Sequence, residues 1–287
     1  MSAPSLAFVG VGAIGLPMAR RLVAAGYPTT GVDALPSAVE RATAAGVPAV
    51  AKLADAPDVS VVVVMVATPE QLEELVTSAL AGSVRGQRWI VMSTVGPDAV
   101  REQGARLAAA GAIVVDSPVT GGVARARTGE LTLFASGASA DIAAVRELLG
   151  CLGSVREVGA NLGDGQAIKV VNQHLCSVHI VAAAEALALA DRLGLDREAV
   201  LPLVEQGAAG SWMLSDRGPR MLQGTDVEVT STIGIFVKDS GLVAEAAGQV
   251  GAETPLLDVA RDRYRRAADA GLLTRDDSRV IETYPSS

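Results

Sequence analysis

The 287-residue sequence predicts an α/β protein in which a doubly wound parallel sheet over residues 1–163 is followed by an all-helical domain over residues 164–287. Three observations support this fold class. Short valine-rich runs alternate with helical patterns in the first half, as in sheets covered by helices on both faces. A helical pattern from Gly165 to Leu193 has no internal proline or glycine. No convincing strand follows residue 160, so the second half is expected to be helical throughout.

The individual elements follow from the period of the apolar residues. Strands are expected where runs are apolar and β-branched, at residues 5–9, 29–33, 47–50, 60–66, 89–93, 112–116, 131–135 and 155–158. Amphipathic patterns between them predict helices at 13–25, 37–45, 70–80, 98–110 and 140–149. Beyond the long helix, further helices are expected at 197–208, 213–222, 230–249 and 256–271. The long helix itself is therefore the expected connection between the two domains, and its small apolar centre favours packing against a second subunit.

Composition narrows the classes of partner. Apolar residues make up 49% of the chain and aromatic residues only 3%, so the core must consist mainly of Ala, Val, Leu and Ile. The formal charge of −8 comes with no basic run, which disfavours nucleic acid as a partner. The run Val59–Ala67 is far shorter than the roughly 20 residues of a membrane span, and the N-terminus lacks the pattern of a signal peptide. We therefore expect a cytoplasmic protein with no membrane partner.

The most informative stretch begins with the apolar strand Leu6–Val9 and continues through a glycine-rich turn into a helix. Asp33 then ends a second strand about 20 residues past the glycines, where a carboxylate can accept the ribose 2′-hydroxyl of a dinucleotide. Strand, glycines, helix and acid stand in the order of a Rossmann unit, whose glycines allow a pyrophosphate to approach the helix N-terminus. The same acid repels a 2′-phosphate, so NAD is expected rather than NADP. The turn residues assigned to the cofactor are Gly10, Gly12, Ala13, Ile14 and Gly15.

A second segment places glycines just before the long helix and a lysine, Lys169, in its second turn. Asn172 and Gln173 follow at i+3 and i+4 and so share the face of Lys169. Most lysines are solvated, but this one has apolar neighbours and lies at the junction of the expected domains, where a substrate cleft is expected. A partly desolvated lysine can act as a general acid or base.

Three further segments carry weaker signals. Asp116-Ser117-Pro118-Val119-Thr120-Gly121-Gly122 ends a strand; its glycines expose N–H groups that can bind a carboxylate, although taken alone a hairpin turn is the more common use of Gly-Gly. Ser93-Thr94 follows a strand at the carboxyl edge, where ligands bind in such folds. Lys238-Asp239 lies within a helical pattern, and a lone Lys-Asp pair on a helix usually lies on the surface. His174 and His179 are five residues apart and near no carboxylate pattern, so no metal site is expected.

With these motifs in order, the chain resembles the β-hydroxyacid dehydrogenase family over essentially its whole length. The glycine motif continues with the family's Met-Ala at Met18-Ala19, and Asp116–Gly122 matches the substrate loop with Ser117 and Thr120 in place of Ala and Ser. Lys169 and Asn172 match the catalytic motif, while Gln173 replaces a common Asn. Lys238-Asp239 matches the family's cofactor-side pair. The C-terminal half is most similar to L-threonate dehydrogenase-type members.

The resemblance implies a homodimeric or homotetrameric enzyme that transfers a hydride between NAD and a small hydroxy acid. It implies Lys169 as general acid and base and Asn172 as its catalytic partner. The residues expected at the substrate are Ser117, Thr120, Gly121, Gly122, Gln173 and Trp212, the last being nearly as compatible with a core position. Beyond the glycine turn and Asp33, the cofactor is expected to meet Met65, Val66, Ala67, Thr94 and Lys238.

Three alternatives remain open at this stage. An imine reductase shares the architecture, but members of that group typically replace the lysine. A non-catalytic dinucleotide-binding protein needs only the first motif. A 6-phosphogluconate-type enzyme is disfavoured by the short helical region and the lack of a basic cluster for phosphate.

Overall fold

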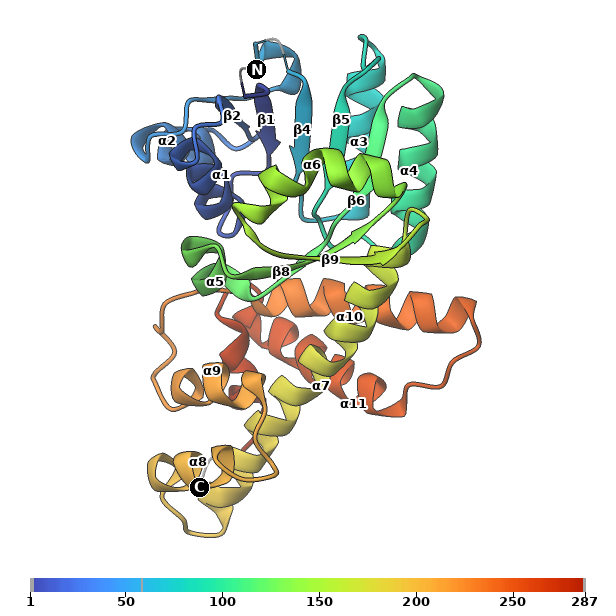
Figure 1. The fold of residues 1–287 in the computed structure, drawn as a ribbon. Coiled ribbons are helices and arrows are strands. Elements are labelled where there is room, and N and C mark those ends of the chain that lie inside the picture. The colour runs from blue at the N-terminus through green and yellow to red at the C-terminus, as the bar shows by residue number, and fades with distance from the viewer. Residues whose placement is uncertain (1–2, 58, 286–287) are drawn as a thin grey trace. The chain divides into compact units, whose positions relative to one another are not determined.

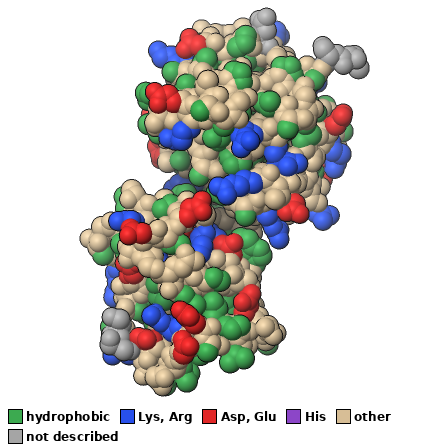
Figure 2. Space-filling model, turned by 90° about the vertical axis from the view of Figure 1, so that its left-hand side faces the viewer, with side chains coloured by type: hydrophobic (Ala, Val, Ile, Leu, Met, Phe, Trp, Pro, Cys, Tyr) green, Lys and Arg blue, Asp and Glu red, His purple; other side chains and the backbone are tan. Residues whose placement is uncertain are grey.

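The computed structural model describes residues 3–57 and 59–285, which fold as two compact units that meet in sequence between Lys169 and Val170. The division falls inside the long helix, whereas the sequence placed the domain boundary at its start. Each unit is described by itself below (Figure 1). On the face that Figure 2 shows, acidic and basic side chains occur on both units.

The N-terminal unit is built on a single sheet with the strand order β3-β2-β1-β4-β5-β6-β8-β7, in which β9 also pairs with β8. Its strands are β1 (Leu6–Val9), β2 (Thr29–Val32), β3 (Ala49–Val50), β4 (Val61–Val64), β5 (Arg88–Val91), β6 (Ile113–Asp116), β7 (Val119–Thr120), β8 (Leu131–Ser136) and β9 (Gly153–Gly159). The first six are parallel, as predicted. β8 runs antiparallel to β6 and β7, and β9 runs parallel to β8. Because β1, β4 and β5 are adjacent and parallel, their carboxyl ends lie side by side.

Both faces of this sheet are covered by helices (Figure 1). The helices are α1 (Gly15–Ala24), α2 (Pro36–Ala44), α3 (Pro69–Leu80), α4 (Pro97–Ala109), α5 (Gly122–Thr128) and α6 (Ser139–Gly150), with a short 3₁₀ turn, η1 (Leu53–Asp55). Alternate residues of β1, β4, β5 and β6 enter different cores: in β1, Leu6 and Phe8 pack with α1, α2, α5 and α6, whereas Ala7 and Val9 pack with α3 and α4. This period of two explains why the central strands read as continuous apolar runs.

The segment around Gly121-Gly122 corrects the sequence interpretation. Taken alone, the Gly-Gly pair favoured a hairpin turn, but Gly122 begins α5. β7 still pairs antiparallel with β8, with Val119 opposite Leu133, although the whole of α5 lies between the two strands in the sequence. Val123 and Ala126, three residues apart, are buried on one side of α5, so a short helix buries more apolar surface here than a two-residue turn.

In the part of it that the structure describes, the C-terminal unit is built from helices, as predicted, with an isolated β-bridge between Thr232 and Asp276. The helices are α7 (Asp164–Arg192, which begins in the N-terminal unit), α8 (Arg197–Glu205), α9 (Trp212–Met221), α10 (Ile233–Gln249) and α11 (Pro255–Ala267), followed by a π-helical turn, η2 (Ala268–Leu272), and a 3₁₀ helix, η3 (Asp277–Thr283). The core of this unit joins Ile180, Ala184 and Leu187 of α7 to apolar residues of the other helices. Phe236 and Tyr264 stack within it, with ring centroids 5.3 Å apart.

The long helix α7 is apolar enough to cross a membrane by length and composition alone, with a mean hydropathy of 1.3 over its most apolar window. A single such helix is weak evidence, because core helices of folded domains have the same composition. Here 44% of that window is buried inside the structure, and the buried residues Ile180, Ala184 and Leu187 of this helix belong to the core just described.

Candidate active site

The glycine turn after β1 has the geometry that a dinucleotide requires. Gly10 has a φ of +92°, and a Cβ on it would lie 2.2 Å from the carbonyl oxygen of Met65. A Cβ on Gly15 would lie 1.9 Å from the oxygen of Gly10, so both positions exclude a side chain. At Gly12 a Cβ would meet nothing within 4 Å, which leaves open space beside the backbone. Gly10 and Gly15 are therefore required by the fold, and Gly12 leaves the access that a pyrophosphate needs.

The surroundings of this turn also fit a dinucleotide. Helix α1 begins at Gly15 after Ile14, and among the described residues no side chain caps its first turn. The Asp33 carboxylate lies beside the turn: its Oδ2 accepts from the N–H of Val11 at 3.1 Å, and its Oδ1 accepts from the N–H of Leu35 at 3.0 Å. A carboxylate offers about four acceptor positions. Asp33 thus shapes the turn and retains acceptor capacity for a ribose hydroxyl.

The other residues of the N-terminal unit that were assigned to the cofactor follow β4 and β5. Met65, Val66 and Ala67 continue β4, and the N–H of Ala67 donates to Gln71 Oε1 at 2.8 Å. Thr94 lies three residues after β5 and is partly exposed. Because β1, β4 and β5 are adjacent and parallel, these residues share the sheet edge at which ligands bind in such folds.

A buried carboxylate at the end of β6, Asp116, receives four hydrogen bonds from neutral groups. Its Oδ2 accepts from Ser136 Oγ (3.1 Å), the N–H of Gly163 (3.1 Å) and the N–H of Gln166 (3.0 Å), and its Oδ1 accepts from Gln166 Nε2 (3.0 Å). Burial raises the pKa of Asp116 to about 6, although these hydrogen bonds lower it in part. Asp116 thereby holds the start of α7, whose first N–H groups otherwise lack partners.

Gln166, in the first turn of α7, uses its whole side-chain amide. Besides donating to Asp116, its Nε2 donates to the carbonyl oxygen of Ser93 at 2.9 Å. Its Oε1 accepts from the N–H groups of Val95 and Gly96, both at 3.1 Å. This one side chain therefore ties the start of α7 to residues 93–96, the segment that contains Thr94.

Lys169 lies one turn after Gln166 and is only 7% exposed. Burying an ammonium group is unfavourable, because it loses its hydration. The burial that its apolar neighbours in the sequence indicated is present, and the catalytic role of Lys169 stays a prediction.

The substrate loop that was expected after β6 is divided between two environments. Ser117 is completely buried, and its hydroxyl has no hydrogen-bond partner among the described residues. Thr120 ends β7 and is partly exposed. Gly121 and Gly122 have φ angles of +131° and +69°, and a Cβ on Gly122 would meet nothing within 4 Å. Backbone in this open, left-handed conformation leaves room for a small ligand at Gly122.

In the C-terminal unit a row of polar side chains links α7 to α10. Asn172 Nδ2 donates to Gln173 Oε1 at 2.9 Å, and Gln173 Nε2 donates to Asp239 Oδ2 at 2.5 Å. The other carboxylate oxygen of Asp239 lies 2.7 Å from Lys238 Nζ. The sequence had assigned Asn172, Gln173 and Lys238 to the site, and the structure joins them through Asp239.

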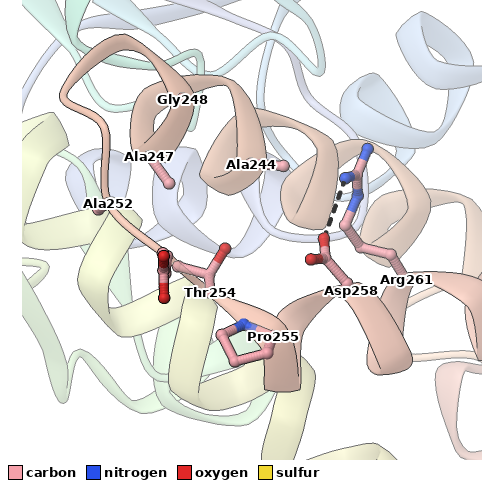
Figure 3. A pocket seen from close by; sticks show the side chains of 9 residues that line it. Ala244, Ala247, Gly248, Ala252, Thr254, Pro255, Asp258 and Arg261 are labelled. Atoms are coloured by element: carbon pink, nitrogen blue, oxygen red, sulfur yellow. Dashed lines mark ion pairs between the residues drawn. The ribbon is translucent and has the colours of Figure 1, made fainter.

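Two remaining features lie apart from this row. Trp212 begins α9 and is 43% exposed, so it does not fill the core; the guanidinium of Arg217 lies 5.9 Å from its ring centre. An open depression of about 410 Å³ lies where α10 ends and α11 begins (Figure 3). None of the predicted site residues lines this depression. Within residues 3–57 and 59–285, no group of three or more His, Cys, Asp or Glu side chains could hold a metal ion.

Sequence reasoning missed roles for Ser136 and Gln166, and it used Asp116 and Asp239 only as parts of motifs. For Gln166 the sequence did offer a signal, because it is a polar residue placed between the glycines before α7 and the apolar residues of its first turns. No local signal pointed to Ser136 or to the contact of Asp239 with Gln173, because the partners lie 20 and 66 residues away in the sequence.

Two family models together span the chain. Residues 5–171 match the NAD-binding domain of 6-phosphogluconate dehydrogenase, and residues 163–284 match the model described as NAD-binding of NADP-dependent 3-hydroxyisobutyrate dehydrogenase.

Individual relatives match over almost their full length. An L-threonate dehydrogenase from Cupriavidus necator is 35% identical over 98% of this chain and 96% of its own. The mitochondrial 3-hydroxyisobutyrate dehydrogenase of Homo sapiens is 30% identical over 96% of this chain and 85% of its own. The crystal structure of a 3-hydroxyisobutyrate dehydrogenase from Salmonella typhimurium is 33% identical, covers 98% of this chain and 99% of its own, and has a TM-score of 0.89.

Proposed function

The chain belongs to the β-hydroxyacid dehydrogenase family, and from this premise we propose that Lys169 is the general acid and base in a hydride transfer between NAD and a small hydroxy acid. The observation that carries the proposal is the burial of Lys169 on a helix whose first turn is bonded to residues 93–96. Those residues follow β5, at the same sheet edge as the open glycine turn.

The chemistry divides between the protein and its cofactor. When bound, the nicotinamide accepts or donates the hydride. In the oxidation, the neutral amine of Lys169 takes the proton of the substrate hydroxyl; in the reduction, its ammonium gives a proton to the developing alkoxide. Asn172 and Gln173 are neutral donors and acceptors that orient the substrate or the lysine without changing the charge of the site. Thr120 and the N–H groups of Gly121 and Gly122 hold the substrate carboxylate.

The replacement Lys169→Ala tests this proposal. We expect kcat to fall by about 10²–10⁴-fold, the usual contribution of general acid–base catalysis, while NADH still binds. Stopped-flow measurement of turnover together with fluorescence titration of NADH separates the two effects. Lys52→Ala removes an exposed lysine and is the matched control, with unchanged kcat. Full turnover by Lys169→Ala would remove this residue from the mechanism.

NAD is proposed over NADP because of Asp33. Its carboxylate is held beside the turn by Val11 and Leu35, where it accepts a ribose hydroxyl and repels a 2′-phosphate. We expect Asp33→Ser to narrow the ratio of kcat/KM for NAD to that for NADP. A wild-type enzyme that already prefers NADP would show that the acid does not read the ribose.

The substrate class follows from the relatives, which are named for L-threonate and 3-hydroxyisobutyrate, both small hydroxy acids. We propose a hydroxy acid of this kind, with a sugar acid as the first candidate. A screen of aldonates, hydroxyisobutyrate, glycerate and phenylserine with NAD identifies it. The absence of turnover across that screen would favour a non-catalytic dinucleotide-binding protein.

The surface of α7 favours a homo-oligomer. Within the C-terminal unit, its exposed positions include an apolar stripe at a spacing of three or four residues or a multiple: Val171, Leu175, Ala182, Ala186 and Leu189. Such a stripe is typical of a helix that packs against another helix. We propose that a second copy of the chain covers it, in a cytoplasmic dimer or tetramer. Sedimentation velocity of Leu189→Glu, which we expect to shift toward monomer, tests the contact.

A further inference from the structure

The network around Gln166 connects two parts of the proposed active site, and the inference drawn from it rests on the proposed function. The first part is the segment of residues 93–96, whose Ser93 carbonyl and whose Val95 and Gly96 N–H groups form hydrogen bonds with the Gln166 side chain. The second part is Lys169, which lies one helical turn after Gln166 on α7. Both Gln166 and Asp116 are completely buried.

The contact between the start of α7 and the sheet is also unusually close. A Cβ on Gly165 would lie 2.3 Å from the carbonyl oxygen of Phe134 in β8 and 2.9 Å from Asp116 Oδ2. The N–H of Gly165 donates to Ser136 Oγ at 2.9 Å, and Ser136 Oγ donates in turn to Asp116. The first turn of α7 is therefore fixed by hydrogen bonds on consecutive residues, with no room to slide.

Ordinary helix capping does not account for this arrangement. Capping requires one or two acceptors for the first N–H groups, and the Asp116 carboxylate and the Ser136 hydroxyl supply them. The side chain of Gln166 makes four further hydrogen bonds, three of which go to residues 93–96 rather than to α7. Those three bonds fix the helix that carries Lys169 relative to the segment that carries Thr94.

We propose that Gln166 and Asp116 are positioning residues for the reaction: they hold Lys169 in register with the segment of residues 93–96 that faces the cofactor. Neither residue needs to touch the substrate. Their effect is on the geometry of proton transfer, which is sensitive to displacements of about 1 Å.

The first test is Gln166→Glu, which keeps the size of the side chain and its acceptor for Val95 and Gly96. It removes the donor to Ser93 and to Asp116 and sets two carboxyl groups against each other. We expect kcat to fall by about ten- to a hundredfold, with the Kd for NADH close to that of the wild type. Asp116→Asn, which opposes two amide donors at the same contact, should lower kcat in the same way if Gln166→Glu does not fold.

The matched control is Gln103→Glu. Gln103 is also a buried glutamine of the N-terminal unit, but it lies on α4 and accepts from Arg106 at 2.7 Å. The same chemical change there should leave kcat unaltered. Equal kcat values for Gln166→Glu and Gln103→Glu, in folded proteins, would overturn the proposal.

A second readout does not depend on turnover. The chain has three lysines, Lys52, Lys169 and Lys238, so acetylation by acetic anhydride can be followed at each by mass spectrometry. We expect Gln166→Glu to raise the acetylation rate of Lys169 relative to exposed Lys52 by about threefold or more, because the start of α7 opens more often. An unchanged ratio would contradict the positioning role. If the wild type turned over no hydroxy acid, the proposed function would fail, while the labelling ratio would still decide whether Gln166 positions Lys169.

Discussion

Buried carboxylates of the two units, one in the N-terminal unit and two in the C-terminal unit, are stabilised in opposite ways. In the N-terminal unit, Asp116 is surrounded by neutral donors. In the C-terminal unit, Asp276 and Asp277 at the start of η3 are paired with arginines of α9: Arg217 forms a bidentate contact with Asp277 at 2.9 and 2.8 Å, and Arg220 lies 2.7 Å from Asp276. All three carboxylates are essentially inaccessible to solvent.

The pKa values follow this difference in partners only in part, because burial raises the pKa of Asp277 despite the opposing charges of Arg217 and Arg220. Burial raises the pKa of Asp116 to about 6, and hydrogen bonds from the neutral groups of Gln166, Ser136 and Gly163 oppose this in part. Burial would also raise the pKa of Asp276, but Ser278, the N–H of Thr230 and the charge of Arg220 together lower it below its usual value. Burial would lower the pKa of Arg217, yet Asp277 and Asp216 raise it. Asp116 and its uncharged donors, the neutral network, orient the start of α7. The ion-pair cluster, in which Asp276 and Asp277 meet Arg217 and Arg220, instead joins η3 to α9.

The largest effect should come from breaking the ion-pair cluster. Asp277→Ala leaves Arg217 buried without its main partner, and we expect a loss of about 3–5 kcal/mol in the free energy of unfolding. Urea denaturation measures it. The control Asp226→Ala removes an exposed ion pair with Arg275 and should cost less than about 1 kcal/mol. Similar losses for the two variants would mean that burial does not distinguish the pairs.

The second prediction concerns pH and the neutral network. Because the pKa of Asp116 is higher in the folded state than its ordinary value of 3.8, folding takes up a proton between about pH 4 and pH 6. The contribution of Asp116 to stability is therefore greatest below pH 4 and is lost as the pH rises to 6, by up to about 3 kcal/mol over the window.

Asp116→Asn removes this titration. Urea denaturation from pH 4 to pH 7 should show a smaller decline in stability for the variant than for the wild type. Parallel curves for the two proteins would show that the carboxylate is not destabilised by burial.

The smallest effect is expected at Ser136, whose hydroxyl donates to Asp116 and accepts from the N–H of Gly165. Ser136→Ala leaves that N–H without a partner, and we expect a loss of about 1–3 kcal/mol in the free energy of unfolding. Ser154→Ala, at an exposed position of β9, should stay within about 0.5 kcal/mol of the wild type. Equal stabilities of the two variants would show that Ser136 lies outside the network.

Local patterns were sufficient for most of the fold. The alternation of apolar runs and helical periods predicted the six parallel strands and the long helix, because each buries its own repeating face. Strand β7 and helix α5 were missed, since they are two and seven residues long and a Gly-Gly pair is compatible with a turn as well as a helix start.

The sequence by itself determined the glycine turn, Asp33 and the candidate lysine, because the chemistry of each depends on neighbours within one supersecondary unit. Only the tertiary structure decided that Lys169 is buried, that Asp116 and Gln166 fix the start of its helix, and that Gln173 is bonded to Asp239. These contacts join residues that are 50 to 73 positions apart. No local period records which buried donor will meet which acceptor, and folding selects the pairs by leaving few polar groups unsatisfied.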